Sequence, residues 1–296
     1  MTGRLFIFGL GFSGLEIAML ARSAGWQVAG TCRGEEKAGR LRALGIETHR
    51  FDGTAPLPDP ALAGTTHVLC TIAPGEAGDP VLRTMAGWPR SVGWFGYLST
   101  TGVYGDRAGG WVDEDTPPRP GQPRSIARLA AERAWEAAAQ AAGAALDVFR
   151  LPGIYGPGRS AIDQVRAGTA RRIDKPGQVF SRIHVEDIAA TVLAALARPG
   201  SAGAVRLFNV ADDLPASTGD VVAFACALLG APVPPAIPWE QAEPALSPMA
   251  RSFYAESRRV RNDRIKDELG VVLRHPTYKE GLEAIALGAR HSDGAS

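Results

Sequence analysis

Short apolar runs alternate with longer amphipathic stretches through the first half of the chain. This alternation is typical of βαβ units built around a parallel sheet. It predicts strands at Arg4–Phe8, Gln27–Thr31, Glu47–Phe51, His67–Ile72, Trp94–Ser99 and Leu146–Arg150. Amphipathic stretches between them predict helices at Gly14–Ala24, Glu35–Leu44, Pro80–Trp88 and Ser125–Ala142. We therefore expect the α/β class, with a Rossmann-type, doubly wound parallel sheet.

The pattern changes after Pro152, where loops rich in Gly and Pro separate fewer regular elements. We interpret residues 1–151 as the main domain and 152–296 as a smaller subdomain, of which 185–210 returns to the main domain. The segment Ala231–Trp239 holds four prolines and must run extended or turn. It serves either as a connector or as a wall of a cleft. The regular elements expected here are a helix at Val185–Ala197, a strand at Val205–Val210 and a helix at Thr218–Leu229.

A glycine-rich motif lies between the first predicted strand and the first predicted helix. It reads Gly9, Leu10, Gly11, Phe12, Ser13, Gly14. Its glycines allow a tight turn, close approach of a pyrophosphate and close helix–strand packing, and the helix N–H groups face the phosphates. We predict a dinucleotide site with Gly9, Gly11, Phe12, Ser13 and Gly14 as binding residues. The alternative is a glycine-rich turn without a ligand.

The end of the second predicted strand indicates which dinucleotide binds. An acidic residue here would bind the ribose hydroxyls of NAD, but Cys32 and Arg33 follow the strand instead. Because a guanidinium can hold a 2′-phosphate, we expect NADP(H) rather than NAD(H). Alternatively, Arg33 is a solvated residue paired with Glu35 or Glu36. Asp52 either neighbours the adenine or only forms a turn before Gly53.

Composition restricts the partners of the chain. Its 32 Lys and Arg against 31 Asp and Glu leave a formal charge of +1, so no overall field favours nucleic acid or an anionic membrane. We find neither a leader pattern nor a bilayer-spanning apolar run. Cys32, Cys70 and Cys226 lie far apart, which favours a reducing, cytoplasmic location. The five histidines show no metal-ligand spacing, so we expect no metal site. They are His49, His67, His184, His275 and His291.

Three blocks in this order resemble the extended short-chain dehydrogenase/reductase family, which includes NAD(P)-dependent epimerases and dehydratases. They are Leu98–Gly105 (LSTTGVYG), Arg150–Arg159 (RLPGIYGPGR) and Arg182–Ala189 (RIHVEDIA). Segments within 261–270 and 275–282 are also similar to this family. The resemblance covers nearly the whole chain.

The resemblance implies roles for individual residues. Thr100 falls on the catalytic Ser/Thr of the family, and Pro152 and Ile154 match residues that back the nicotinamide. His184 matches a segment leading back to the main domain, and we interpret it as structural. The loop beside the cofactor corresponds to Thr71, Ile72, Ala73 and Pro74.

The family's Tyr-x-x-x-Lys pair is missing. Arg124 stands at the tyrosine position and Arg128 at the lysine position, on one helix face. A guanidinium keeps its proton near neutral pH, so the usual acid–base pair is absent. This substitution resembles an atypical subgroup of the family. Tyr104 and Tyr155 are alternative proton donors, although both are expected to pack structurally. Alternatively, both arginines form surface ion pairs with Glu132 or Asp115.

Two hypotheses remain. In the first, the chain is an NADP(H)-dependent oxidoreductase or epimerase-like enzyme acting on a small polar, anionic metabolite, with Thr100, Arg124 and Arg128 as its catalytic residues. Thr100 and Arg124 would polarise a carbonyl oxygen, and Arg128 would hold the nicotinamide ribose. In the second, it is an NADP(H)-binding sensor without turnover. The family resemblance also implies a homodimer that pairs through Ser125–Ala142.

Overall fold

The computed structural model describes residues 3–293. Its centre is a sheet of seven strands, and every pairing within it is parallel. The strand order is β11-β7-β5-β4-β1-β2-β3, which confirms the predicted doubly wound α/β fold. The strands are β1 (Arg4–Phe8), β2 (Gln27–Cys32), β3 (Glu47–Arg50), β4 (His67–Cys70), β5 (Trp94–Thr100), β7 (Ala145–Leu151) and β11 (Val205–Asn209).

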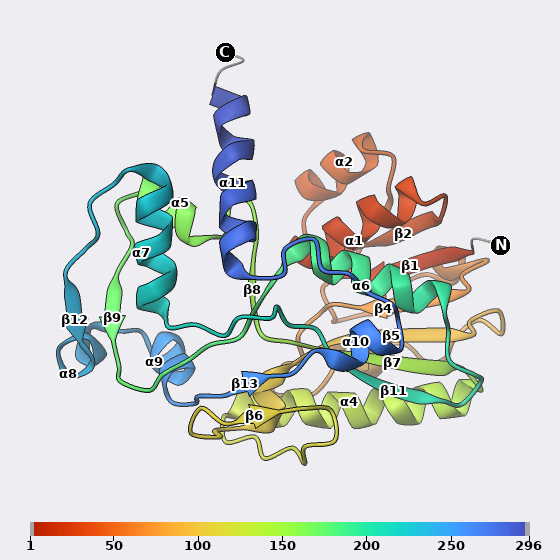
Figure 1. Cartoon of the computed structure of the whole chain (residues 1–296). Helices are drawn as coiled ribbons and strands as arrows, with labels where there is room; N and C mark the ends of the chain where they lie inside the picture. Colours follow the sequence, from red (N-terminus) through yellow and green to blue (C-terminus); the bar gives the residue numbers. More distant parts are fainter. Residues whose placement is uncertain (1–2, 294–296) are drawn as a thin grey trace.

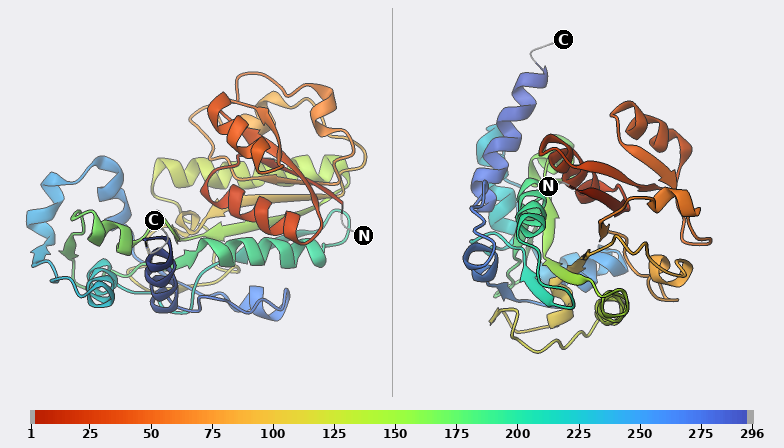
Figure 2. Two further views of the ribbon diagram at one scale, coloured as in Figure 1. Left: turned by 90° about the horizontal axis from the view of Figure 1, so that it is seen from above. Right: turned by 90° about the vertical axis from the view of Figure 1, so that its right-hand side faces the viewer.

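Helices cover both faces of this sheet (Figures 1 and 2). One face carries α1 (Phe12–Ser23), α2 (Glu35–Ala43) and α6 (Val185–Ala197), and the other carries α3 (Pro80–Thr84) and α4 (Pro123–Ala142). Alternate residues of β1 point to opposite faces, because successive side chains of a strand alternate. Leu5 and Ile7 therefore pack with α1 and α6, whereas Phe6 and Phe8 join the cluster around Trp135 of α4.

The second half of the chain both rejoins this sheet and extends beyond it. Strand β11 pairs with β7, and α6 packs on α1. A second group of elements lies at the carboxyl ends of the strands (Figure 1). It comprises β8 (Gly153–Tyr155), α5 (Ala161–Arg166), β9 (Arg172–Asp174), β10 (Arg182–His184), α7 (Thr218–Leu229), β12 (Ala236–Pro238), α8 (Trp239–Ala242), α9 (Pro248–Tyr254) and α11 (Tyr278–Asp293). Two short elements, β6 (Trp111–Val112) with β13 (Arg259–Val260), pair beside α4, and α10 (Asp263–Asp267) packs near β11.

Several predicted boundaries need correction. The helix expected at Pro80–Trp88 ends at Thr84, where Met85 turns extended and Gly87 and Pro89 follow. The strand expected to reach Ile72 ends at Cys70, because Thr71 turns its side chain toward the glycine turn. Helix α4 begins two residues early, at Pro123, whose fixed φ suits a first helical position. The proline-rich segment contains β12, which pairs with β9.

A buried polar network joins the sheet to α4. Arg150 of β7 forms a two-point ion pair with Glu132, with nitrogen–oxygen distances of 3.2 and 2.8 Å. Glu132 also accepts a hydrogen bond from Ser99 of β5. Arg150 donates to the Tyr104 hydroxyl at 3.0 Å, and that hydroxyl donates to Asn209 at 2.7 Å. The network fixes α4 against the carboxyl ends of β5 and β7.

None of the described helices is long and apolar enough to cross a bilayer.

Removing one member of the buried ion pair should be costly. We expect Glu132→Gln to lower the free energy of unfolding by about 3–5 kcal/mol, because it leaves the Arg150 charge buried without an anion. Urea denaturation measures this change. Glu136→Gln on the same helix is a control outside this network, and we expect it to change the free energy by less than about 0.5 kcal/mol. Equal stabilities for the two variants would contradict this reading.

Candidate active site

The glycine turn after β1 is held by two threonines. Gly9 adopts φ +97°, a conformation that L side chains rarely adopt. Its N–H donates to Thr31 Oγ1 at 2.9 Å, and Thr71 Oγ1 donates to its carbonyl oxygen at 2.5 Å. Thr71 was predicted from the family resemblance, whereas Thr31 lies inside a strand and gave no sequence signal. Strand β2 and the residue that follows β4 thus set the shape of this turn.

Gly11 and Gly14 have different roles in the turn. A Cβ built on Gly14 would lie 2.2 Å from the Gly9 carbonyl oxygen, so only glycine permits this approach of α1 to β1. A Cβ on Gly11 would meet nothing within 4 Å. Gly14 is therefore required by the packing of the protein itself, whereas Gly11 borders open space. This is the arrangement in which a phosphate can approach the backbone.

The N-terminus of α1 is ready to receive an anion. Its N-cap is Gly11, no side chain caps its first N–H groups, and its first turn contains no acidic residue. These N–H groups and the helix dipole favour a negative charge here. Ser13 and Gly14 are buried in this turn, and Phe12 is half-buried. The five predicted residues of the motif therefore form one continuous turn.

A cavity of about 280 Å³ lies beyond the ends of β2 and β3 and brings four predicted residues together. They are Arg33, Asp52, Ile72 and Ala73. The same cavity contains Arg83, which donates to the Gly53 carbonyl oxygen at 3.0 Å. No sequence motif includes Arg83, so its place in this cavity was not predicted. The cavity thus offers two guanidinium groups.

The alternative partners considered for Arg33 bind elsewhere. Glu35 pairs with Arg42 at 2.7 Å, and Glu36 lies 3.5 Å from Arg40. Within residues 3–293, Arg33 is exposed and forms no salt bridge with either glutamate. The proposed ion pairing of Arg33 is therefore wrong.

Asp52 forms the turn before Gly53, which was one of the two interpretations of this residue. Its Oδ1 accepts from the Thr54 N–H at 2.9 Å and from the Thr54 hydroxyl at 2.6 Å. These hydrogen bonds hold the pKa of the carboxyl below its usual value. Asp52 also lines the smaller cavity. The two interpretations are therefore compatible.

A larger cavity of about 670 Å³ opens where the carboxyl ends of β5 and β7 meet the second half of the chain. This is the position at which open α/β sheets bind their ligands. It brings together Thr100, Arg124, Arg128, Pro152 and Ile154, all five of which were predicted. Its opposite wall includes Phe180, Arg182, Thr218, Ala250, Ser252, Phe253, Tyr254, Glu256 and Arg258.

Two of the hydroxyl groups that line the cavity come from β5 and α4. Thr100 ends β5, and its Oγ1 accepts the Gly102 N–H at 3.1 Å. Ser125, in the first turn of α4, lies beside Gly102: a Cβ built on Gly102 would be 2.6 Å from the Ser125 Oγ. The sequence analysis did not single out Ser125, since no motif includes it. Its hydroxyl is a further polar group of the cavity.

The two arginines of α4 are held differently. Arg128 donates to the Leu98 carbonyl oxygen at 2.6 Å, and its guanidinium lies 5.6 Å from the centre of the Tyr97 ring. Arg124 is exposed, and its guanidinium lies 4.3 Å from the centre of the Phe253 ring. Both line the larger cavity, one helical turn apart. Arg128 is thus anchored to the sheet, whereas Arg124 contacts α9 across the cavity.

The surface ion pairs that we considered for these arginines do not form. Glu132 is bound to Arg150, and Asp115 is bound to Arg264 at 3.0 Å. That alternative is wrong, because the buried network takes Glu132 out of reach.

The alternative tyrosines have structural contacts. Tyr104 is fully buried and bonds Arg150 and Asn209. Tyr155 donates to the Thr277 carbonyl oxygen at 3.4 Å and lies against the His184 ring. Burial raises the pKa of both hydroxyls above its usual value. Neither tyrosine lines the larger cavity.

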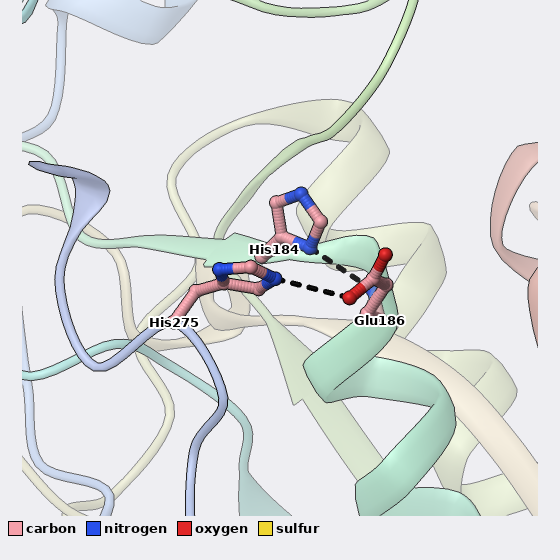
Figure 3. A group of neighbouring side chains, drawn as sticks. All are labelled: His184, Glu186 and His275. Atoms are coloured by element: carbon pink, nitrogen blue, oxygen red, sulfur yellow. Dashed lines mark hydrogen bonds and ion pairs between the residues drawn. The ribbon is translucent and has the colours of Figure 1, made fainter. Parts of the chain in front are cut away.

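His184, Glu186 and His275 meet at the start of α6 (Figure 3). His184 Nδ1 accepts the Glu186 N–H at 3.3 Å and caps this helix, which is a structural contact. Burial lowers the pKa of His184 to about 4, so the ring is neutral near pH 7. His275 Nε2 lies 3.0 Å from Glu186 Oε2, and Arg274 lies 3.1 Å from the same oxygen. One potential ligand atom from each of the three residues lies within 4.8 Å of the others, a grouping that sequence spacing did not predict.

Comparisons with known proteins agree with this geometry. The family model of the NAD dependent epimerase/dehydratase family matches residues 82–211. A solved structure of a functionally unknown conserved protein from Silicibacter pomeroyi DSS is 47% identical, with a TM-score of 0.86, over 97% of this chain and 99% of that chain. Residues 82–211 therefore match the NAD dependent epimerase/dehydratase family, and the whole chain shares the fold of the Silicibacter pomeroyi protein.

Two further proteins resemble the chain more distantly. A human epimerase family protein, SDR39U1 (isoform 2), solved with NADPH, has a TM-score of 0.74 and 18% identity, over 96% of this chain and 99% of that chain. A 3-diazoavenalumate denitrifying reductase from Streptomyces sp. is 28% identical over 184 residues, which cover 58% of this chain and 58% of the relative. The match thus spans less than two thirds of that curated relative.

The two glycines allow a matched test of the turn. We expect Gly11→Ala to weaken NADPH binding by about tenfold or more while changing the free energy of unfolding by at most about 1 kcal/mol, because its methyl group would meet only the ligand. Gly14→Ala should instead lower that free energy by about 1–3 kcal/mol, since its methyl group would collide with the Gly9 carbonyl oxygen. Fluorescence titration and urea denaturation measure the two effects. Wild-type NADPH affinity in Gly11→Ala would count against the site.

Proposed function

We propose that the protein is an NADP(H)-dependent oxidoreductase or epimerase-like enzyme that acts on a small polar, anionic metabolite. The observation that carries this proposal is the series of three features along one edge of the sheet. They are the cavity with Arg33, the uncapped start of α1 and the cavity with Thr100. An extended dinucleotide has three corresponding parts: an adenosine end, a pyrophosphate and a nicotinamide.

The residues present fit such a cofactor. Open space beside Gly11 and the free N–H groups of α1 suit the pyrophosphate. Ile72 and Ala73 line the cavity for the adenosine end, and Pro152 and Ile154 line the cavity for the nicotinamide. When bound, the nicotinamide would supply or accept a hydride.

The preference for NADP(H) rests on Arg33. It is exposed, has no acidic partner among the described residues and shares its cavity with Arg83. A 2′-phosphate would receive charge-assisted hydrogen bonds from such a guanidinium. The ribose hydroxyls of NAD carry no charge for it to bind.

Thr100, Arg124 and Arg128 would act on the substrate and the ribose. Thr100 and Arg124 would polarise a carbonyl oxygen, and Arg128, anchored at Leu98, would hold the nicotinamide ribose. Neither arginine can exchange a proton near neutral pH. The proton that the substrate oxygen takes up would therefore come from a solvent molecule or from a hydroxyl such as that of Ser125. The contacts that hold Tyr104 and Tyr155 elsewhere favour a second candidate, an NADP(H)-binding sensor without turnover.

We also propose a cytoplasmic homodimer. The three free cysteines are buried and unpaired among the described residues, which suits a reducing compartment. Helix α4 exposes 51% of Ile126, an apolar contact for a second chain. Light scattering of the purified protein tests the dimer.

Arg33 should determine the choice between the two dinucleotides. We expect Arg33→Gln to weaken NADPH binding by about tenfold and to leave NADH binding within about twofold, because only NADPH carries the extra phosphate. The control is Arg40→Gln, which removes an exposed arginine of α2 outside this cavity. Fluorescence titration with both dinucleotides provides the readout. Equal affinity of the wild-type protein for NADPH and NADH would refute the proposed preference.

Measurement of NADPH turnover distinguishes the proposed enzyme from the proposed sensor. We expect the protein to consume NADPH with members of a carbonyl substrate panel, and Thr100→Val to lower kcat/KM by about 10²–10³ without changing NADPH affinity. Spectrophotometry at the NADPH absorption band measures the rate. Binding without consumption across the whole panel would favour the sensor.

A further inference from the structure

The larger cavity carries an excess of positive charge. Five arginines line it, and Glu256 is its one acidic residue. That carboxylate is already paired with Arg258 at 2.7 Å. Within the described chain, the other four guanidiniums form no salt bridge. They belong to Arg124, Arg128, Arg159 and Arg182.

Two of these four arginines donate hydrogen bonds within the protein, and the other two contact aromatic rings. Arg128 donates to the Leu98 carbonyl oxygen, and Arg182 donates to the Phe180 and Ala216 carbonyl oxygens at 2.8 and 2.9 Å. Arg159 lies over the Phe12 ring, beside the glycine turn. Arg124 likewise contacts a ring, that of Phe253. The hydrogen-bond donors of Arg124 are therefore available to a ligand.

The contact between Arg124 and Phe253 restricts what those donors can bind. A guanidinium is planar, and its five N–H groups point outward in that plane. When its face covers an aromatic ring, the donors remain free at its edge. A carboxylate that accepts two of them lies in the same plane, as a fork-to-fork pair. A planar group attached to that carboxylate can continue along the aromatic wall.

That wall is apolar and partly exposed. Phe253 is 51% exposed although it lines the cavity, and it belongs to α9 together with Tyr254. The Tyr254 ring meets Phe180 edge-on, at 5.4 Å between ring centres. Exposed aromatic surface beside convergent polar groups is typical of a ligand site. This wall can therefore bind a ring of the same ligand whose negative charge binds Arg124.

We propose that the substrate of this site is an aromatic carboxylic acid. Arg124 binds its carboxylate at two points, and Phe253 contacts its ring. The proposal rests on the function proposed above, because it assigns the substrate side of the same cavity. It gives Arg124, at the family's tyrosine position, a role in substrate binding, and it leaves the polarisation of the reacting carbonyl oxygen to Thr100.

The test compares four small probes on the protein saturated with NADPH. Benzoate carries both features, benzamide keeps the ring without the charge, cyclohexanecarboxylate keeps the charge without a planar ring, and inorganic phosphate is a non-carboxylate anion. We expect benzoate to bind best and each other probe to bind at least about fivefold more weakly, as measured by ligand-observed NMR titration. Tighter binding of phosphate or benzamide than of benzoate would overturn the proposal.

Single substitutions test which residues bind benzoate. We expect Arg124→Gln to weaken benzoate binding by about tenfold and to leave benzamide binding unchanged. Phe253→Leu should weaken benzoate more than cyclohexanecarboxylate. Arg171→Gln, an exposed arginine outside the cavity, should behave as wild type. Unchanged benzoate affinity in folded Arg124→Gln, with folding checked by circular dichroism, would overturn the assignment.

The same titrations separate the two proposals. If NADPH binds and benzoate does not, the substrate assignment fails and the cofactor proposal stands. If NADPH does not bind, the function proposed above fails, and the benzoate titration of the free protein still decides whether Arg124 and Phe253 form a carboxylate site.

Discussion

The approach of α1 to β1 determines how the rest of this site is arranged. Gly14 lies so close to the Gly9 carbonyl oxygen that a single methyl group would prevent the contact. The contact places the start of α1 at the carboxyl edge of the sheet, and Thr31 of β2 and Thr71 after β4 hold the turn. Since all seven strands are parallel, their carboxyl ends share this edge. Both cavities are therefore lined by residues at this edge.

The chemistry of the larger cavity depends on a buried ion pair beneath it. Glu132 and Arg150 neutralise each other inside the protein and hold α4 against β5 and β7. Because Glu132 is taken by this pair, Arg128 and Arg124, one and two turns earlier, have no acidic partner among residues 3–293. Arg124, which we predicted to stand at the family's tyrosine position, therefore presents a permanent positive charge to the cavity. Such a group suits binding and polarisation rather than proton transfer.

The first half of the fold could be predicted from the sequence, because each of its strands and helices has a local pattern. The glycine motif and Arg33 could also be predicted from local patterns. The motif lies between a predicted strand and a predicted helix, and Arg33 follows the end of a predicted strand. Residues whose role comes from distant contacts had no such signal. Thr31 lies inside a strand, Arg83 on a short helix, and Phe253 reaches Arg124 from 129 positions further along the chain. The short strands after Pro152 were missed because two or three residues carry no periodicity.

The pairing of distant segments also explains the other features of the structure that the sequence did not predict. His275 joins His184 and Glu186 through a loop that returns 89 residues after Glu186, which no spacing rule could anticipate. Strand β12 was hidden by the prolines around it, because proline suits only the edge of a sheet, and β12 pairs with the single strand β9.

The measurement that tests the account most directly is a titration of the unmodified protein with NADPH, followed by fluorescence. The account predicts saturable binding of one NADPH per chain, tighter than the binding of NADH. A protein that is folded yet shows no saturable binding of either dinucleotide would contradict it.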